Sequence, residues 1–168
     1  MQRRMLAPLA EALQPAPEFV CVDAPSLARG DFGWWHQGFA GWEESRDWVA
    51  GLLAEEEFDG VFGFSQGAAL AGLLCAALDP PPGFAIMAGG FTSPFERHAY
   101  LFRRKLPVPS AHIIGKTDRI VPPAASLLLA DRFEQPQVIE HAGGHVVPSD
   151  PAVAAQLDGF LNRVKETG

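Results

Sequence analysis

A serine flanked by glycines has the clearest chemical potential in this chain. Gly63-Phe64-Ser65-Gln66-Gly67 follows an apolar run at 60–62 and precedes a run of small and apolar residues at 68–78. A G-x-S-x-G pattern between a strand and a helix is typical of a nucleophile elbow, in which glycines leave room for a strained serine. The N–H groups that begin the helix can then stabilise an oxyanion. We interpret Ser65 as a nucleophile and the Gln66 backbone N–H as an oxyanion donor.

An acid and a base follow in the order that such a nucleophile requires. Asp118 comes after a predicted buried strand at 111–114, and His145 comes in a loop after a predicted strand at 137–140. A serine hydroxyl becomes a good nucleophile when a neutral imidazole takes its proton and a carboxylate orients that imidazole. The five-residue pattern alone also fits an ordinary glycine-rich turn. The order Ser, Asp, His at successive strand ends favours a catalytic triad.

Both partners of the serine have alternatives in the sequence. Asp118 also fits a turn or helix-cap residue ahead of a helix that begins near Pro122. His141 competes with His145 for the role of base, but it lies at the end of the predicted strand. His145 follows two glycines that would let the loop fold over the serine. We therefore prefer His145 as the base.

The other histidines and the cysteines predict no metal site. His112 lies inside a predicted strand and fits a core or sheet-face residue, and His36 and His98 lie in loops without metal-ligand spacing. Cys21 and Cys75 are expected to be buried free thiols. The chain also has neither a G-x-G-x-x-G motif nor a P-loop. We expect chemistry that needs no cofactor and no metal.

The same segments resemble the FSH-type serine hydrolases, a branch of the α/β-hydrolase superfamily. The similar stretches are, in family order, F-V-C-V-D-A-P at 19–25, G-W-W at 33–35, F-D-G-V-F-G-F-S-Q-G-A at 58–68, G-K-T-D-R-I-V-P at 115–122 and G-G-H-V-V-P at 143–148. The wider carboxylesterase and acyl-protein thioesterase group shares the G-F-S-Q-G elbow. The resemblance implies esterase or thioesterase activity on acyl substrates, including in some members release of an acyl or polyketide chain from an acyl carrier.

The beginning of the chain departs from that family. Its members open with a strand that ends in a His-Gly loop and supplies a second oxyanion N–H, whereas the apolar residues within 5–13 have helical spacing here. We expect an N-terminally incomplete domain with a vacant place between predicted strands at 19–22 and 60–64. The strand at 19–22 would then pair with 60–64, stay at a poorly covered edge, or recruit another chain.

Hydrophobic periodicity predicts one α/β domain over residues 1–168. Strands are expected at 19–22, 60–64, 84–88, 111–114 and 137–140, and helices at 43–55, 67–78, 123–133 and 152–164. This alternation predicts an α/β-hydrolase-type, mostly parallel sheet of about five strands, with helices on both faces in three layers. A ligand site is expected outside the carboxyl ends of the strands, where all three triad candidates fall.

Two loop segments are candidates for the acyl pocket. The glycine-rich stretch 31–42 contains five large aromatic residues, Trp34 and Trp35 among them, and suits an apolar wall. The alternative is a satellite hydrophobic cluster that pins the loop to the body. The stretch 91–109 begins with Phe91 and mixes aromatic with basic residues, which fits a cover, a contact for an acidic carrier, or a solvated amphipathic helix. We predict Trp34, Trp35 and Phe91 as substrate-pocket residues.

Charge and hydropathy restrict the partners. The 168-residue chain has a formal net charge of −7 and no basic run, which argues against nucleic acid. It has no run of ~18 apolar residues and no recognisable signal peptide, so we expect a cytoplasmic protein without a membrane partner. The sequence leaves open whether the protein forms a homo-oligomer.

These observations predict a serine carboxylesterase or thioesterase that works through a Ser65-Asp118-His145 triad and an acyl-enzyme. The competing hypothesis is a non-catalytic or weakly active hydrolase-like fragment without the second oxyanion donor. Loss of one such donor lowers turnover by roughly 10² to 10³. Because that loss weakens an enzyme without abolishing it, we favour catalysis.

Overall fold

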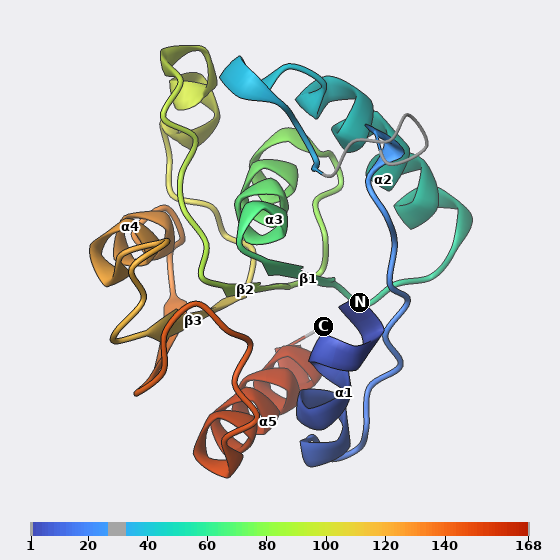
Figure 1. Ribbon diagram of the computed structural model, residues 1–168. Coiled ribbons are helices and arrows are strands. Elements are labelled where there is room, and N and C mark those ends of the chain that lie inside the picture. Colours follow the sequence, from blue (N-terminus) through green and yellow to red (C-terminus); the bar gives the residue numbers. More distant parts are fainter. Residues whose placement is uncertain (1, 27–32, 168) are drawn as a thin grey trace.

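The computed structural model describes residues 2–26 and 33–167 (Figure 1). Its helices are α1 (Gln2–Ala12), α2 (Trp42–Glu55), α3 (Gln66–Ala77), α4 (Pro123–Ala130) and α5 (Pro151–Thr167), with short 3₁₀ turns η2 (Gln37–Phe39) and η3 (Glu96–Phe102). Its strands are β1 (Val61–Phe64), β2 (Ala85–Ala88), β3 (Ser110–Gly115) and β4 (Pro136–His141). Asp31 and Phe32 of the predicted aromatic loop lie outside the described residues.

The four strands form one parallel sheet in the order β1-β2-β3-β4. The register places Met87 beside His112 and Ile113 beside Ile139. Each strand end at the carboxyl edge leads directly into a loop or helix, and the parallel direction brings those ends together. The α/β prediction is confirmed, with four strands where about five were expected.

Helices cover both faces of the sheet. Figure 1 shows α1 and α5 on one face and α3 and α4 on the other, with α2 lying outside α3. Side chains alternate along β2 because successive residues of a strand point to opposite faces. Ile86 and Ala88 share a buried cluster with Leu9 and Leu157, whereas Met87 packs with Phe133 in a cluster on the α3 and α4 side. The predicted three-layer arrangement follows from this alternation.

The strand predicted at 19–22 does not form. Residues 16–24 have no regular secondary structure, and Val20 is 49% exposed. Phe19 contacts β1 through its side chain, with its ring edge-on to Phe62 at 5.8 Å between centroids. A strand is stabilised by backbone bonds to a neighbour, and this segment has a ring contact in their place. The prediction is therefore wrong at this element, and the segment stays beside a poorly covered edge of the sheet.

The outer edge of β1 faces no strand in the described part of the chain. The Val61 and Ser65 N–H groups donate to carbonyl groups of the β2 side. In a parallel pair only alternate residues bond to the same neighbour. The peptide groups of Phe62 and Phe64 therefore point toward the outer edge.

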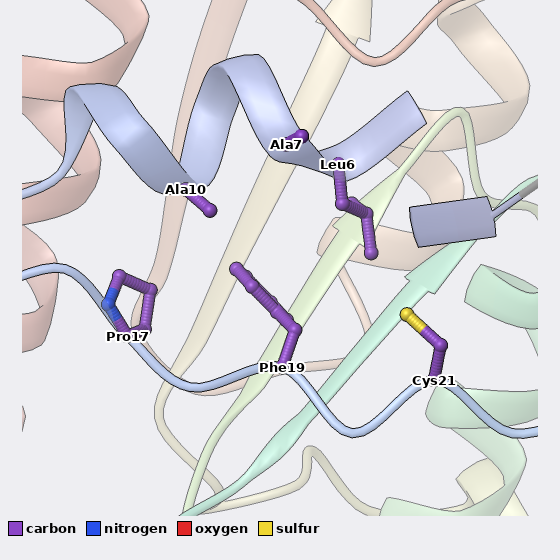
Figure 2. Close-up of a pocket in the computed structure, with 6 residues that line it drawn as sticks. All are labelled: Leu6, Ala7, Ala10, Pro17, Phe19 and Cys21. Atoms are coloured by element: carbon purple, nitrogen blue, oxygen red, sulfur yellow. The ribbon is translucent and has the colours of Figure 1, made fainter. Parts of the chain in front are cut away.

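A cavity of about 180 Å³ lies near this edge, between α1 and the segment 17–21. Figure 2 shows side chains from both elements pointing into it. The lining residues are mostly apolar: Leu6, Ala7, Ala10, Pro17, Phe19 and Cys21. Cys21 was expected to be buried, but it is half-buried because the strand that would have enclosed it does not form.

Candidate active site

Ser65 lies at a sharp turn between β1 and α3. Its backbone has φ 55° and ψ −119°, and it is the one non-glycine residue with positive φ among the described residues. A Cβ atom at Gly63 would lie 2.2 Å from the Gly67 carbonyl oxygen, so a side chain at position 63 cannot be accommodated. The Ser65 N–H donates to the Ala88 carbonyl at 2.9 Å. This strained turn, tied to β2, fixes the direction of the serine hydroxyl.

Loops after β3 and β4 bring two predicted partners to this serine. His145 Nε2 lies 2.9 Å from Ser65 Oγ, and His145 Nδ1 lies 2.7 Å from Asp118 Oδ2. An ionised carboxylate only accepts hydrogen bonds, so Nδ1 carries the proton and Nε2 is free to accept one from the hydroxyl. The three side chains thus form one continuous hydrogen-bonded chain.

Asp118 combines the two roles that its sequence position suggested. Its Oδ1 atom accepts hydrogen bonds from the Ile120 and Val121 N–H groups at 2.9 Å each, while Oδ2 faces His145. The side chain is almost buried, and burial opposes its ionisation. The hydrogen bonds from His145 and the two N–H groups outweigh burial and hold the pKa of Asp118 below its usual value. The turn therefore supplies an ionised, oriented acceptor.

Glycines at the strand ends let the His145 loop approach closely. Gly89, just after β2, has φ +55°, and a Cβ atom there would lie 3.1 Å from His145 Cε1. A Cβ atom at Gly115 would lie 2.3 Å from the Gly144 carbonyl oxygen. The Phe64 ring lies 4.7 Å from the imidazole, between centroids. Gly89 and Gly115 were not predicted from the sequence, although a glycine at the end of a buried strand is a detectable signal of such close approach.

His141 and His112 have partners other than the serine. His141 is 8% exposed, and its Nδ1 accepts a hydrogen bond from the Gly143 N–H at 3.2 Å. Burial lowers the pKa of His141. His112 is 1% exposed beside Ser110 and Phe133, and burial lowers its pKa to about 4. It is the core histidine that the sequence predicted.

Gln66, the predicted oxyanion donor, is the first residue of α3. The first N–H groups of a helix have no partner within it, so the Gln66 N–H is available at the elbow. Its side chain turns away toward the aromatic segment. Gln66 Oε1 accepts a hydrogen bond from the Trp34 N–H at 2.8 Å, and Nε2 donates to the Trp35 carbonyl at 3.1 Å. Gln66 thus has its backbone at the elbow and its side chain bonded to the aromatic segment.

Comparison with known proteins identifies the family. The family model described as serine hydrolase (FSH1) matches residues 4–157. The chain belongs to this family. Its elbow, acid and base occupy the segments on which the sequence resemblance rested.

Relatives of this chain include proteins named esterases. The chain is 40% identical to Esterase OVCA2 of Xenopus tropicalis over 147 residues, covering 76% of this chain and 64% of that protein. It is 33% identical to Esterase OVCA2 of Homo sapiens over 202 residues, covering 95% of this chain and 87% of that protein. The chain spans between 38% and 64% of the length of several curated relatives that it matches.

A solved structure supports the fold. A carboxylesterase from Mesorhizobium loti superposes with a TM-score of 0.65 at 19% identity, over 95% of this chain and 82% of that chain. Because the sequence identity is low, this structural similarity supports the α/β-hydrolase architecture and nothing further.

The predicted pocket residues lie in and around one hydrophobic cluster. Trp35 is 8% exposed and shares that cluster with Trp42 and with residues of α3. Trp34 and Phe91 are half-buried and pack against it. The positions of these rings match the alternative of a satellite hydrophobic cluster that pins the loop to the body. Their contact with an acyl chain stays a prediction.

The segment 91–109 contains η3 and has two kinds of side chain. Tyr100 is 58% exposed, whereas Leu101 and Phe102 pack against the cluster around Trp35. A second cavity, of about 230 Å³, is lined by residues of this segment and by Arg132. This segment is closer to the predicted solvated amphipathic helix than to a cover over the site.

The described residues contain no group of three or more His, Cys, Asp or Glu side chains that would suit a metal ion. Cys75 is buried, and burial raises the pKa of its thiol to about 12, so it stays protonated at neutral pH. No described helix is long and apolar enough to cross a membrane. The compartment stays a prediction.

Proposed function

We propose that this serine hydrolase cleaves carboxylic esters or thioesters with short or medium acyl chains through an acyl-enzyme on Ser65. The supporting observation is the hydrogen-bonded chain from Asp118 through His145 to Ser65. The esterase names of its relatives favour ester substrates. The proposal treats the chain as a single α/β-hydrolase domain.

The first step is attack on the substrate carbonyl. Ser65 Oγ forms a bond to the carbonyl carbon while His145 Nε2 takes the hydroxyl proton. Asp118 keeps the Nδ1 proton in place and stabilises the imidazolium that forms. The Gln66 N–H donates to the oxygen on which negative charge develops. The tetrahedral intermediate collapses when His145 returns its proton to the leaving alcohol or thiol, and the acyl group remains on Ser65.

The second step reverses these roles with water. His145 Nε2 removes a proton from a water molecule, which attacks the acyl carbon. A second tetrahedral intermediate then releases the free acid, and the proton returns to Ser65 Oγ. Ester and thioester substrates differ only in the leaving group of the first step. An acyl carrier that presents its chain as a thioester is therefore a candidate donor.

Active-site labelling tests the nucleophile. A fluorophosphonate probe should react with the wild-type protein, and Ser65→Ala should abolish the adduct. Ser93→Ala is the matched control, because Ser93 Oγ also lies near an imidazole nitrogen, at 2.7 Å from His98 Nδ1. It should leave labelling unchanged. An adduct that maps to Ser93 or Ser126 in the wild type would overturn the assignment.

Hydrolysis of graded p-nitrophenyl esters and acyl thioesters tests the substrate class. The aromatic cluster beside the elbow and the lack of a charged recognition motif favour these substrates over peptides. Preferential peptide hydrolysis would contradict the proposal. A well-folded protein with no hydrolytic activity would support the competing hypothesis of a non-catalytic hydrolase-like fragment.

A further inference from the structure

The segment 33–35 is held in place by side chains from three other parts of the chain. Four of its hydrogen bonds join Ser26 Oγ to the Gly33 carbonyl, the Trp34 N–H to Gln66 Oε1, Ser45 Oγ to the Trp34 carbonyl, and Gln66 Nε2 to the Trp35 carbonyl. Backbone polar groups outside regular structure need such partners when water is excluded. The conformation of this segment therefore depends on those side chains.

Gln66 makes two of these four bonds. Its amide oxygen accepts from Trp34 and its amide nitrogen donates to Trp35, so each end of the amide has the correct partner. A Cβ atom at Gly33 would lie 2.9 Å from Gln66 Oε1, which shows how closely the segment approaches this side chain. A carboxylate at position 66 would lack the donor to the Trp35 carbonyl, and an apolar side chain would make neither bond.

The same contacts place Trp34 over the first turn of α3. Its indole Nε1 lies 3.4 Å from the position that a Cβ atom of Gly67 would occupy. Gly67 is two residues from Ser65. The Trp34 carbonyl is fixed from the opposite side by Ser45 of α2, which is 3% exposed. The indole is thus held next to the nucleophile elbow by bonds to two helices.

We propose that Gln66 is a positioning residue that sets acyl-chain selectivity, because its side chain fixes Trp34 as a wall of the acyl site. This inference rests on the proposed esterase function. The Gln66 backbone N–H serves the oxyanion independently of the side chain. Loss of the side-chain bonds should therefore weaken binding of the longer acyl chains that reach the wall more than binding of short ones.

Gln66→Met is the main test. Relative to p-nitrophenyl acetate, we expect kcat/KM for p-nitrophenyl octanoate to fall about tenfold in this variant, mostly through KM. Gln66→Glu keeps the acceptor for Trp34 and loses the donor to Trp35, so its effect should be intermediate. An equal loss on both esters would show a general structural defect and overturn the inference.

Hydrogen exchange gives a readout that does not depend on activity. The Trp34 amide should exchange faster in Gln66→Met than in the wild type, and Gln66→Glu should retain most of its protection. Gln137→Met is the matched control, since Gln137 on β4 also bridges to a backbone carbonyl, that of Gln156 at 2.9 Å. It should change neither the length profile nor exchange at Trp34. Unchanged Trp34 exchange in Gln66→Met would contradict the inference.

A second variant covers the case in which Gln66→Met does not fold. Ser45→Ala removes the bond to the Trp34 carbonyl and leaves Gln66 intact, so it should lower selectivity for octanoate in the same direction. Fluorophosphonate labelling separates the two proposals. A wild-type protein that is neither labelled nor hydrolytic overturns the esterase proposal and this inference together. If the wild type is labelled, but the dependence of kcat/KM on acyl-chain length is unchanged in Gln66→Met, Gln66→Glu and Ser45→Ala, this inference alone is overturned.

Discussion

The carboxyl edge of the sheet and the outer edge of β1 differ in how many of their polar groups have hydrogen-bond partners. At the carboxyl edge, Asp118 uses both oxygens and His145 both ring nitrogens, and glycines admit loops at close distance. At the outer edge, the peptide groups of β1 face no described strand, and a cavity of about 180 Å³ lies nearby. Ser65 is tied to β2 on its inner side. The hydrogen bonds described for Ser65, His145 and Asp118 therefore come from the β2 side of β1 and from the loops after β3 and β4.

The largest expected effects are at the carboxyl edge. His145→Ala should lower kcat by about 10⁶-fold and Asp118→Asn by about 10⁴-fold, because the hydroxyl loses its base or the base loses its orientation. His141→Ala is the control and should stay within about threefold of the wild type, with Ser65 labelling intact. Steady-state kinetics on a p-nitrophenyl ester measures all three. Loss of activity in the control but not in His145→Ala would show that the base is misassigned.

Two phenylalanines test the difference in packing between the core and the open edge. Phe133 is fully buried, so Phe133→Ala should lower the free energy of unfolding by about 4 kcal/mol. Phe19 is half-buried beside the cavity, and Phe19→Ala should cost only about 1 kcal/mol. Urea denaturation gives both values. Equal losses would mean that the 17–21 segment is packed as tightly as the core.

Two glycines sharpen the contrast between the elbow and the surface. Gly63→Ala should lower the free energy of unfolding by about 3 kcal/mol, since its Cβ atom would overlap the Gly67 carbonyl. Gly51 lies in the exposed face of α2 with no atom within 4 Å of an added Cβ. Gly51→Ala should stabilise the protein by up to about 1 kcal/mol through helix propensity. A tolerated Gly63→Ala would contradict the elbow geometry.

His112 predicts a pH dependence that originates in the core. Its folded pKa of about 4 lies below the ordinary value of 6.5, so the unfolded chain binds the extra proton first as the pH falls. The free energy of unfolding should therefore decrease between about pH 6.5 and pH 4, by up to about 3 kcal/mol from this residue. Burial also lowers the pKa of His98 and His141, which contribute in the same direction.

Replacement of His112 isolates its share of that dependence. Urea unfolding at several pH values should show a smaller decrease for His112→Phe than for the wild type. An identical pH profile for His112→Phe would show that the imidazole is not buried in the neutral form.

Local patterns predicted the elements in which one segment carries its own signal. Helical spacing, the small residues after Ser65 and the short apolar runs placed four strands and the main helices within a few residues of where they lie. The predicted strand at 19–22 does not form, although the outer edge of β1 has free peptide groups and Phe19 lies against Phe62. The apolar pattern of a segment does not report whether its backbone comes close enough to a neighbouring strand to form hydrogen bonds.

The order of reactive residues along the chain predicts the chemistry that is available to it. The glycine-flanked serine, the acid after one strand and the histidine after the next occur in an order that favours one kind of reaction. Which histidine meets Ser65 depends on tertiary contacts, because it requires the close approach allowed by Gly89 and Gly115 across three strands. The tertiary structure also decided the contacts of Gln66, whose side chain joins α3 to residues more than thirty positions earlier. Hydrogen bonds between distant segments have no local pattern, so the path of the whole chain sets them.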